Sequence, residues 1–160
     1  MQLMRMTGLQ FLSLGCSGNC KMQPYFADVL CDADVDALVF DSFSNPDAKM
    51  IEERLFPFIE QLQAAHPGIP LIFQQTISRE RRNFDLATDK KEQAKQDMAA
   101  KLMKEACKKY KDVYFIQTDA ADELEETSVD GTHPGDYGYT LWAKSIEKPL
   151  LKILKKYGIK

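Results

Sequence analysis

The chain has 160 residues, of which 44% are hydrophobic and 28% are charged, and its formal net charge is −3. These values are typical of one soluble globular domain with a sizeable core, and they give no reason to expect a nucleic acid or an acidic membrane surface as a partner. No apolar run approaches the roughly 20 residues that a membrane-spanning helix needs.

The pattern of apolar residues predicts strands that alternate with helices along a single domain, residues 1–160. Strands are expected over 9–14, 36–41, 71–76 and 113–117, and helices over 24–31, 47–65, 89–110 and 136–157. An acidic loop is expected over 119–126. Strands separated by helices indicate a parallel sheet covered by helices on both faces, which is an α/β fold.

The N-terminus and the cysteines bear on the cellular compartment. The first eight residues are too short and too polar for a secretory signal, so the sequence as it stands predicts a cytoplasmic protein. A secreted or periplasmic location is expected instead if the natural protein begins upstream of Met1. The four cysteines contain no Cys-x-x-Cys pair, which favours reduced thiols over disulfides and predicts no zinc site.

An aspartate and a histidine three residues apart, Asp130 and His133, stand in a turn just before the last predicted helix. A carboxylate that accepts a hydrogen bond from imidazole Nδ1–H fixes the tautomer and leaves Nε2 free as a general base. The alternative is structural, because Asp-Gly and Pro-Gly are common in turns and Asp136 can cap the helix that follows.

Two earlier loops, each after a predicted strand, carry groups that can donate hydrogen bonds. Gly18 can present its backbone N–H at close range, and Asn45 can present its side-chain amide. Because ligands bind at the carboxyl ends of parallel strands, these two donors can form an oxyanion hole. The structural alternatives are that Gly18 is a turn glycine and that Asn45 caps a helix with Pro46 as its first residue.

The three loops together resemble motifs of the SGNH (GDSL-like) hydrolase superfamily. Gly-Cys-Ser-Gly-Asn at 15–19 resembles its second motif, Asp-Ser-Phe-Ser-Asn-Pro at 41–46 its third, and Asp-Gly-Thr-His-Pro at 130–134 its fifth. The resemblance covers roughly residues 9–155. It implies a three-layer α/β/α flavodoxin-like fold, with Gly18 and Asn45 as oxyanion donors, His133 as general base and Asp130 as its orienting carboxylate.

The nucleophilic serine of that superfamily has no counterpart here. It lies in a Gly-Asp-Ser or Gly-x-Ser motif at the end of the family's first strand, and no Gly-Asp-Ser occurs in this chain. We therefore expect the serine upstream of Met1, residues 1–8 to match the end of the helix that follows it, and the fold to be incomplete at its N-terminus. A strand near the middle of the sheet is then missing.

Ser17 is the alternative nucleophile within the chain, since it follows a predicted strand and precedes a helix. It occupies the second motif, however, and a nucleophile there would displace the oxyanion glycine. The basic stretch 78–82 is expected to be a solvated loop, with substrate contact by Arg79, Arg81 or Arg82 as the alternative.

The resemblance implies an ester hydrolase that acts on short acyl esters or acetylated carbohydrate, and it implies no cofactor and no metal. The rival is a catalytically inactive remnant that binds a ligand or self-associates. A sheet with a missing strand exposes an edge, which predicts a homodimer. A flavodoxin-like nucleotide binder is disfavoured because the chain contains no Gly-x-Gly-x-x-Gly loop.

Overall fold

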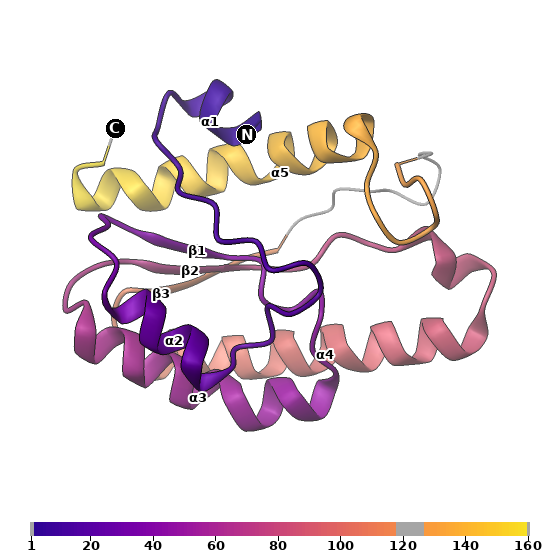
Figure 1. The fold of residues 1–160 in the computed structure, drawn as a ribbon, viewed down its shortest axis with the longest axis horizontal. Coiled ribbons are helices and arrows are strands. Elements are labelled where there is room, and N and C mark those ends of the chain that lie inside the picture. Colours follow the sequence, from indigo (N-terminus) through magenta and orange to yellow (C-terminus); the bar gives the residue numbers. More distant parts are fainter. Residues whose placement is uncertain (1, 118–126, 160) are drawn as a thin grey trace.

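The computed structural model describes residues 2–117 and 127–159, which form a parallel sheet between two layers of helices (Figure 1). Its strands are β1 (Leu38–Phe40), β2 (Leu71–Gln74) and β3 (Val113–Ile116), in the spatial order β1-β2-β3. Both pairs of neighbouring strands are parallel. The predicted α/β class is therefore confirmed. The acidic loop expected over 119–126 lies outside the described residues.

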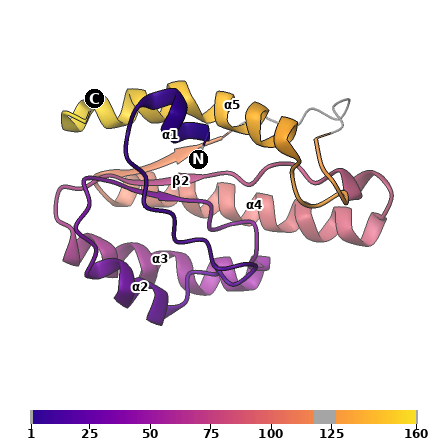
Figure 2. The same cartoon turned by 45° about the horizontal axis from the view of Figure 1, so that its top comes forward.

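Helices cover both faces of the sheet (Figures 1 and 2). One face carries α1 (Gln2–Thr7) and α5 (Asp136–Leu154), and the other carries α2 (Pro24–Cys31), α3 (Ala48–Ala65) and α4 (Leu86–Lys109). Two short 3-10 helices, η1 (Glu80–Asn83) and η2 (Lys155–Tyr157), complete the described elements.

The central strand β2 is buried along its whole length, as expected for a parallel strand covered on both faces. Leu71 and Phe73 belong to the core beneath α2, α3 and α4, whereas Ile72 belongs to the core beneath α5. The alternation of side chains along one strand thus connects the two halves of the core.

The helix starts decide two of the structural alternatives. Helix α3 is capped by Asp47, whose side chain accepts a 2.8 Å hydrogen bond from the backbone N–H of Met50. Asn45 is therefore not the cap of this helix. Helix α5 has Gly135 at the N-cap position and no side-chain cap, so the expectation that Asp136 caps it is wrong.

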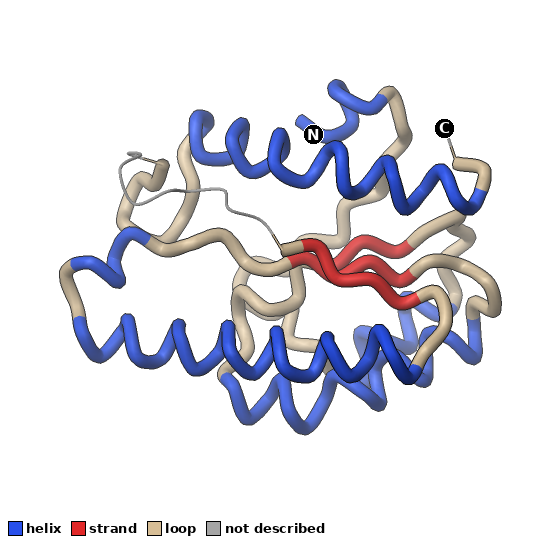
Figure 3. The backbone as a smooth tube through the Cα atoms, turned by 180° about the vertical axis from the view of Figure 1, so that it is seen from behind, coloured by secondary structure: helices blue, strands red, loops and turns tan. Residues whose placement is uncertain are grey.

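The strand expected over 9–14 is wrong, because these residues have no regular secondary structure (Figure 3). Leu9 and Phe11 still pack against the core beneath α5, but Leu12 is 74% exposed. A strand requires a neighbour that pairs with its backbone. Among the described residues no strand pairs with this segment, and β1 pairs with β2 alone.

Three further features concern membrane-spanning helices, metal-binding groups and the cysteines. Among the described helices, none combines the length and the apolar character needed to cross a bilayer. Within residues 2–117 and 127–159, no group of three or more His, Cys, Asp or Glu side chains is arranged to hold a metal ion. The four cysteines are free thiols.

Candidate active site

Asp130 and His133 contact each other directly. The Nδ1 atom of His133 lies 2.8 Å from Oδ2 of Asp130. The other carboxylate oxygen, Oδ1, accepts hydrogen bonds from the backbone N–H groups of Thr132 (2.9 Å) and His133 (2.8 Å). One side chain therefore shapes the turn and orients the imidazole at the same time.

The hydrogen bonds to Asp130 keep its carboxyl group ionised. The backbone N–H of His133, then its imidazole, then the backbone N–H of Thr132 hold the pKa of Asp130 well below its usual range. An ionised carboxylate can only accept, so Nδ1 of the imidazole carries the hydrogen. In this tautomer the lone pair lies on Nε2, which has no hydrogen-bond partner among the described residues and belongs to a side chain that is 73% exposed.

The turn that holds this pair is closed by its own backbone. Ser128 and Pro134 form an antiparallel bridge, and the N–H of Val129 donates to the carbonyl of His133 at 2.9 Å. Gly131 has a φ of +78° at the tip of this turn, a conformation that glycine adopts without strain. The Asp-Gly pair seen in the sequence is thus a real turn, and it also orients the histidine.

Gly18 lies in a tight turn after the extended segment 8–16. The N–H of Asn19 donates to the carbonyl of Cys16 at 3.0 Å, and Ser17 and Gly18 have φ values of +40° and +79°. Positive φ at both central positions is the pattern of a type I′ turn. Gly18 and Ser17 are both exposed, and an added Cβ at Gly18 would meet no atom within 4 Å.

Asn45 is an exposed residue in the loop between β1 and α3. Its side chain makes no hydrogen bond to any described residue. The preceding residue, Ser44, is held firmly: its hydroxyl donates to Oδ1 of Asp41 at 2.7 Å and lies 2.5 Å from Oγ1 of Thr76. The amide of Asn45 is therefore available as a donor on a loop whose backbone is fixed.

The basic stretch after β2 connects two of these loops, a role that the sequence analysis missed. Arg79 donates to the carbonyl of Ser44 at 2.6 Å, and the N–H of Arg81 donates to the carbonyl of Gly131 at 2.9 Å. Between them, Glu80 accepts hydrogen bonds from Thr127 and Ser128. In the sequence, the only indication of this linking role was that these charged residues follow a buried strand.

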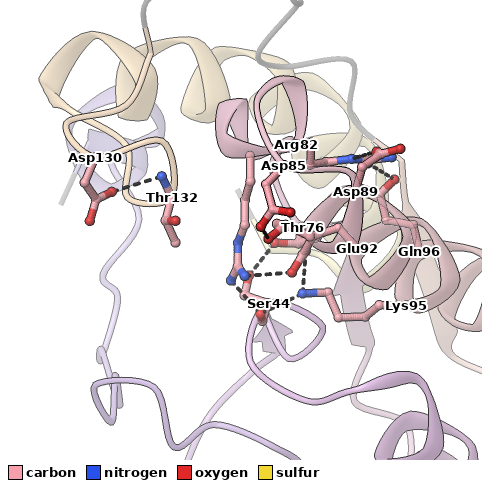
Figure 4. Close-up of polar contacts among 12 residues, drawn as sticks. Ser44, Thr76, Arg82, Asp85, Asp89, Glu92, Lys95, Gln96, Asp130 and Thr132 are labelled. Carbon is pink, nitrogen blue, oxygen red and sulfur yellow. Dashed lines mark hydrogen bonds and ion pairs between the residues drawn. The ribbon is translucent and has the colours of Figure 1, made fainter.

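Two of the three arginines considered for substrate contact bind other side chains of the protein. The guanidinium of Arg79 also pairs with Glu92 at 2.9 Å, and that of Arg82 bonds Asp89, Gln93 and Gln96. Figure 4 shows the network on α4 beside Ser44 and, apart from it, the hydrogen bond from Thr132 to Asp130. No hydrogen bond or ion pair between described residues joins His133 directly to Gly18 or Asn45; the stretch 79–81 links the turn of His133 to the loop of Asn45, and not to the loop of Gly18.

A family model for the GDSL-like lipase/acylhydrolase family matches residues 1–151 of this chain. The chain belongs to the GDSL-like lipase/acylhydrolase family. This confirms the resemblance inferred from the three motifs and agrees with the α/β fold. The match does not assign the site residues, which stay predictions.

Solved structures with the same fold include three proteins of related description. A protein described as a GDSL-like lipase from Bacteroides ovatus ATCC 8483 has 37% sequence identity and a TM-score of 0.90 over 96% of this chain. A salicylyl-acyltransferase from a tetracycline biosynthetic pathway has 20% identity and a TM-score of 0.74 over 95%. An acetyl esterase mutant with an acetate ion has 16% identity and a TM-score of 0.71 over 97%. The last two show similarity of fold alone.

This GDSL-like chain spans less than half the length of two of these proteins. It spans 46% of the Bacteroides ovatus protein and 48% of the acyltransferase, but 88% of the acetyl esterase. None of the curated proteins compared with the chain matches it.

Proposed function

We propose that this domain is the acid–base and oxyanion part of an ester hydrolase that uses a Ser-His-Asp triad. In this reaction His133 Nε2 takes the proton from a serine hydroxyl as that oxygen attacks the ester carbonyl carbon, and later returns it to the departing alcohol. Asp130 keeps the imidazole in the required tautomer and stabilises the imidazolium that forms. The observation that carries this proposal is the 2.8 Å contact between His133 Nδ1 and Asp130 Oδ2, with Nε2 exposed.

The negative charge that develops on the carbonyl oxygen needs donors, and we assign this role to Gly18 and Asn45. The backbone N–H of Gly18 lies in an open turn, and the Asn45 side chain is not used as a helix cap. In known enzymes, loss of one such donor lowers kcat by about 10² to 10³. The substrate class follows from the family: short acyl esters, with acetylated carbohydrate as the specific candidate.

The nucleophile in this proposal is a serine upstream of Met1. The sequence contains no Gly-Asp-Ser, and among the described residues β1 pairs with β2 alone, whereas the flavodoxin-like order places a further strand on the other side of β1. That strand is the one that ends at the nucleophile in the superfamily. Ser17 stays the alternative nucleophile within residues 1–160.

The test is hydrolysis of p-nitrophenyl acetate by the 160-residue chain and by its His133→Ala variant. We expect neither protein to exceed the background rate, because the serine is absent. Hydrolysis that His133→Ala abolishes would instead place the nucleophile within this chain, and Ser17→Ala would be measured next. The same assay then applies to the extended protein, meaning residues 1–160 preceded by the natural upstream reading frame.

A non-catalytic role is the second candidate, and one observation favours it. Strand β1 pairs only with β2 among the described residues, so its other edge is open, and open edges favour pairing between chains. In this case the domain self-associates as a homodimer. Sedimentation of the 160-residue chain as a monomer at all concentrations would count against that role.

A further inference from the structure

Two cations and one anion are buried together behind the loop that carries Asn45. Lys95 and Glu92 on α4 have side chains that are 3% and 5% exposed, and Arg79 is 20% exposed. Glu92 contacts both cations, with 2.9 Å to Arg79 and 2.5 Å to Lys95. We call these three residues the charge cluster.

Stability alone does not explain such a cluster. Removing charges from water has a large free-energy cost, and well-packed apolar residues of similar volume often stabilise a protein as well or better. The cost is visible at Lys95, whose pKa burial lowers even though Glu92 acts in the opposite direction. The position of the cluster therefore calls for another explanation.

Both cations of the cluster donate to one backbone atom. The carbonyl oxygen of Ser44 accepts from the Arg79 guanidinium at 2.6 Å and from Lys95 Nζ at 3.0 Å. Hydrogen bonds from charged donors are about twice as strong as neutral ones. Figure 4 shows Lys95 and Glu92 reaching from α4 toward Ser44, with Thr76 beside them.

The peptide unit that begins at this carbonyl ends at the N–H of Asn45. With the Ser44 hydroxyl bonded to Asp41 and beside Thr76, the orientation of that peptide is fixed from three parts of the chain: the end of β1, the end of β2 and helix α4. Asn45 itself has no hydrogen bond to a described residue. Its position is therefore set entirely through its backbone.

We propose that Arg79 and Lys95 are positioning residues that hold Asn45 at the edge of the sheet by binding the carbonyl of Ser44, while Glu92 keeps the two cations together. This rests on the proposed function, because the purpose of a fixed Asn45 is to donate a hydrogen bond to the oxyanion. Neither cation touches the substrate. Their effect on the reaction passes through Asn45.

The test is the order of Asn45 in the 160-residue chain, measured by 15N relaxation. The main variant is Arg79→Met/Glu92→Met/Lys95→Met, which removes all three charges of the cluster; the nearby Asp41, whose carboxyl pKa is raised by burial, keeps its hydrogen bond from Ser44. We expect the order parameter of the Asn45 N–H to fall from about 0.85 to below about 0.6. Arg82→Met is the matched control, since Arg82 also binds α4 but does not contact Ser44.

Two outcomes overturn the proposal: an Asn45 N–H that stays ordered in the folded triple variant, or one that loses the same order in Arg82→Met. If the triple variant does not fold, Lys95→Met serves instead, because it leaves the Arg79–Glu92 pair in place. Lys95→Arg keeps a cation at this site and is expected to retain most of the order.

A second readout separates this proposal from the proposed function. In the extended protein, the triple variant is expected to lower kcat for p-nitrophenyl acetate by about tenfold or more while KM changes less than about twofold, in the direction expected for a lost oxyanion donor. If Asn45→Ala leaves kcat unchanged, the oxyanion role of Asn45 is wrong. The relaxation result still decides whether the cluster positions Asn45.

Discussion

The carboxylate of Glu80 accepts two hydrogen bonds from Thr127, one from its backbone N–H at 2.5 Å and one from its hydroxyl at 2.8 Å. The two residues are 47 positions apart in the sequence. Glu80 also pairs with the hydroxyl of Ser128, at the base of the turn that holds Asp130 and His133. A residue outside the family motifs, at the start of η1, therefore anchors the turn of the candidate acid–base pair.

The first prediction concerns the contribution of Glu80 to the stability of the fold at acid pH. The hydroxyl of Ser128, followed by the two donors of Thr127, holds the pKa of Glu80 below its usual value. A carboxyl group whose pKa is lower in the folded chain stabilises the fold above its unfolded pKa of about 4.3, and this contribution is lost as the pH falls through the folded pKa. We expect Glu80→Gln to unfold more easily than the wild type at pH 7 and to lose less stability on going to pH 3.

Urea unfolding at pH 7 and pH 3 measures this difference, with Glu105→Gln as control because Glu105 is an exposed residue on α4. At pH 7 the Gln carbonyl oxygen can still accept from Thr127, but a neutral acceptor makes weaker hydrogen bonds than a carboxylate, so the change should cost about 1 kcal/mol. Equal acid sensitivity in the wild type and Glu80→Gln would contradict the assigned contacts.

The second prediction concerns the close approach between α5 and the same loop. A Cβ added at Gly138 would lie 2.1 Å from the carbonyl oxygen of Thr127, which is far inside van der Waals contact. Gly138→Ala must therefore move α5 or the loop, and we expect it to destabilise the fold by about 1–3 kcal/mol.

Gly15→Ala is the control for Gly138→Ala, because a Cβ at Gly15 would meet no atom within 4 Å and its φ is not in the left-handed region. Thermal unfolding compares the two variants. A Gly138→Ala protein as stable as Gly15→Ala would show that the contact between Gly138 and Thr127 is not as tight as described.

The third prediction distinguishes a role of Asn45 in the reaction from a role in capping helix α3. Asp47 caps α3, so Asp47→Ala should cost about 1 kcal/mol of stability. Asn45→Ala should leave stability within about 0.5 kcal/mol of the wild type but lower kcat of the extended protein by about 10² to 10³. Chemical unfolding and p-nitrophenyl acetate kinetics give the two values. A reversed pattern would make Asn45 a structural residue.

The sequence predicted the sheet and its helices well because their apolar periodicity reflects burial. It failed at 9–14, where Leu9 and Phe11 are packed into the core as the pattern indicates, but the backbone has no neighbouring strand to pair with. Periodicity reports which side chains are buried and does not report whether a partner strand is present.

The contacts of the candidate site were only partly predictable. Asp130 and His133 are three residues apart, so a local turn was enough to infer their contact. The links from Arg79 to Ser44 and from Glu80 to Thr127 span 35 and 47 positions. Such contacts depend on the folded arrangement of β1, β2 and α5, which no local pattern encodes.

The fourth prediction tests the role of Asp130. Asn at this position can still accept the two backbone hydrogen bonds through its carbonyl oxygen, but its NH₂ group would face Nδ1 and favour the wrong tautomer of His133. We expect Asp130→Asn to fold and to lower kcat of the extended protein by about 10⁴, which is the loss known for the equivalent Asp-to-Asn change in the Ser-His-Asp triad of serine proteases. Asp136→Asn, an exposed acid in the first turn of α5, is the control.

The contact between Asp130 and His133 also has a pH signature. Because these hydrogen bonds lower the pKa of Asp130 in the folded chain, they contribute stability that is present above the unfolded pKa of about 3.9 and is lost as the pH falls through the lower folded pKa. The carboxyl-carbon chemical shift of Asp130 should therefore show no step near pH 4. A step near pH 4 would mean that Asp130 titrates as a free carboxyl group.

The most direct test of the central claim is hydrolysis of p-nitrophenyl acetate by the extended protein and its His133→Ala variant. We predict hydrolysis above background in the first and a loss of at least about 10³-fold in the second, because the general base is removed. Hydrolysis that survives His133→Ala unchanged would contradict the assignment of Asp130 and His133 as the acid–base pair of this domain.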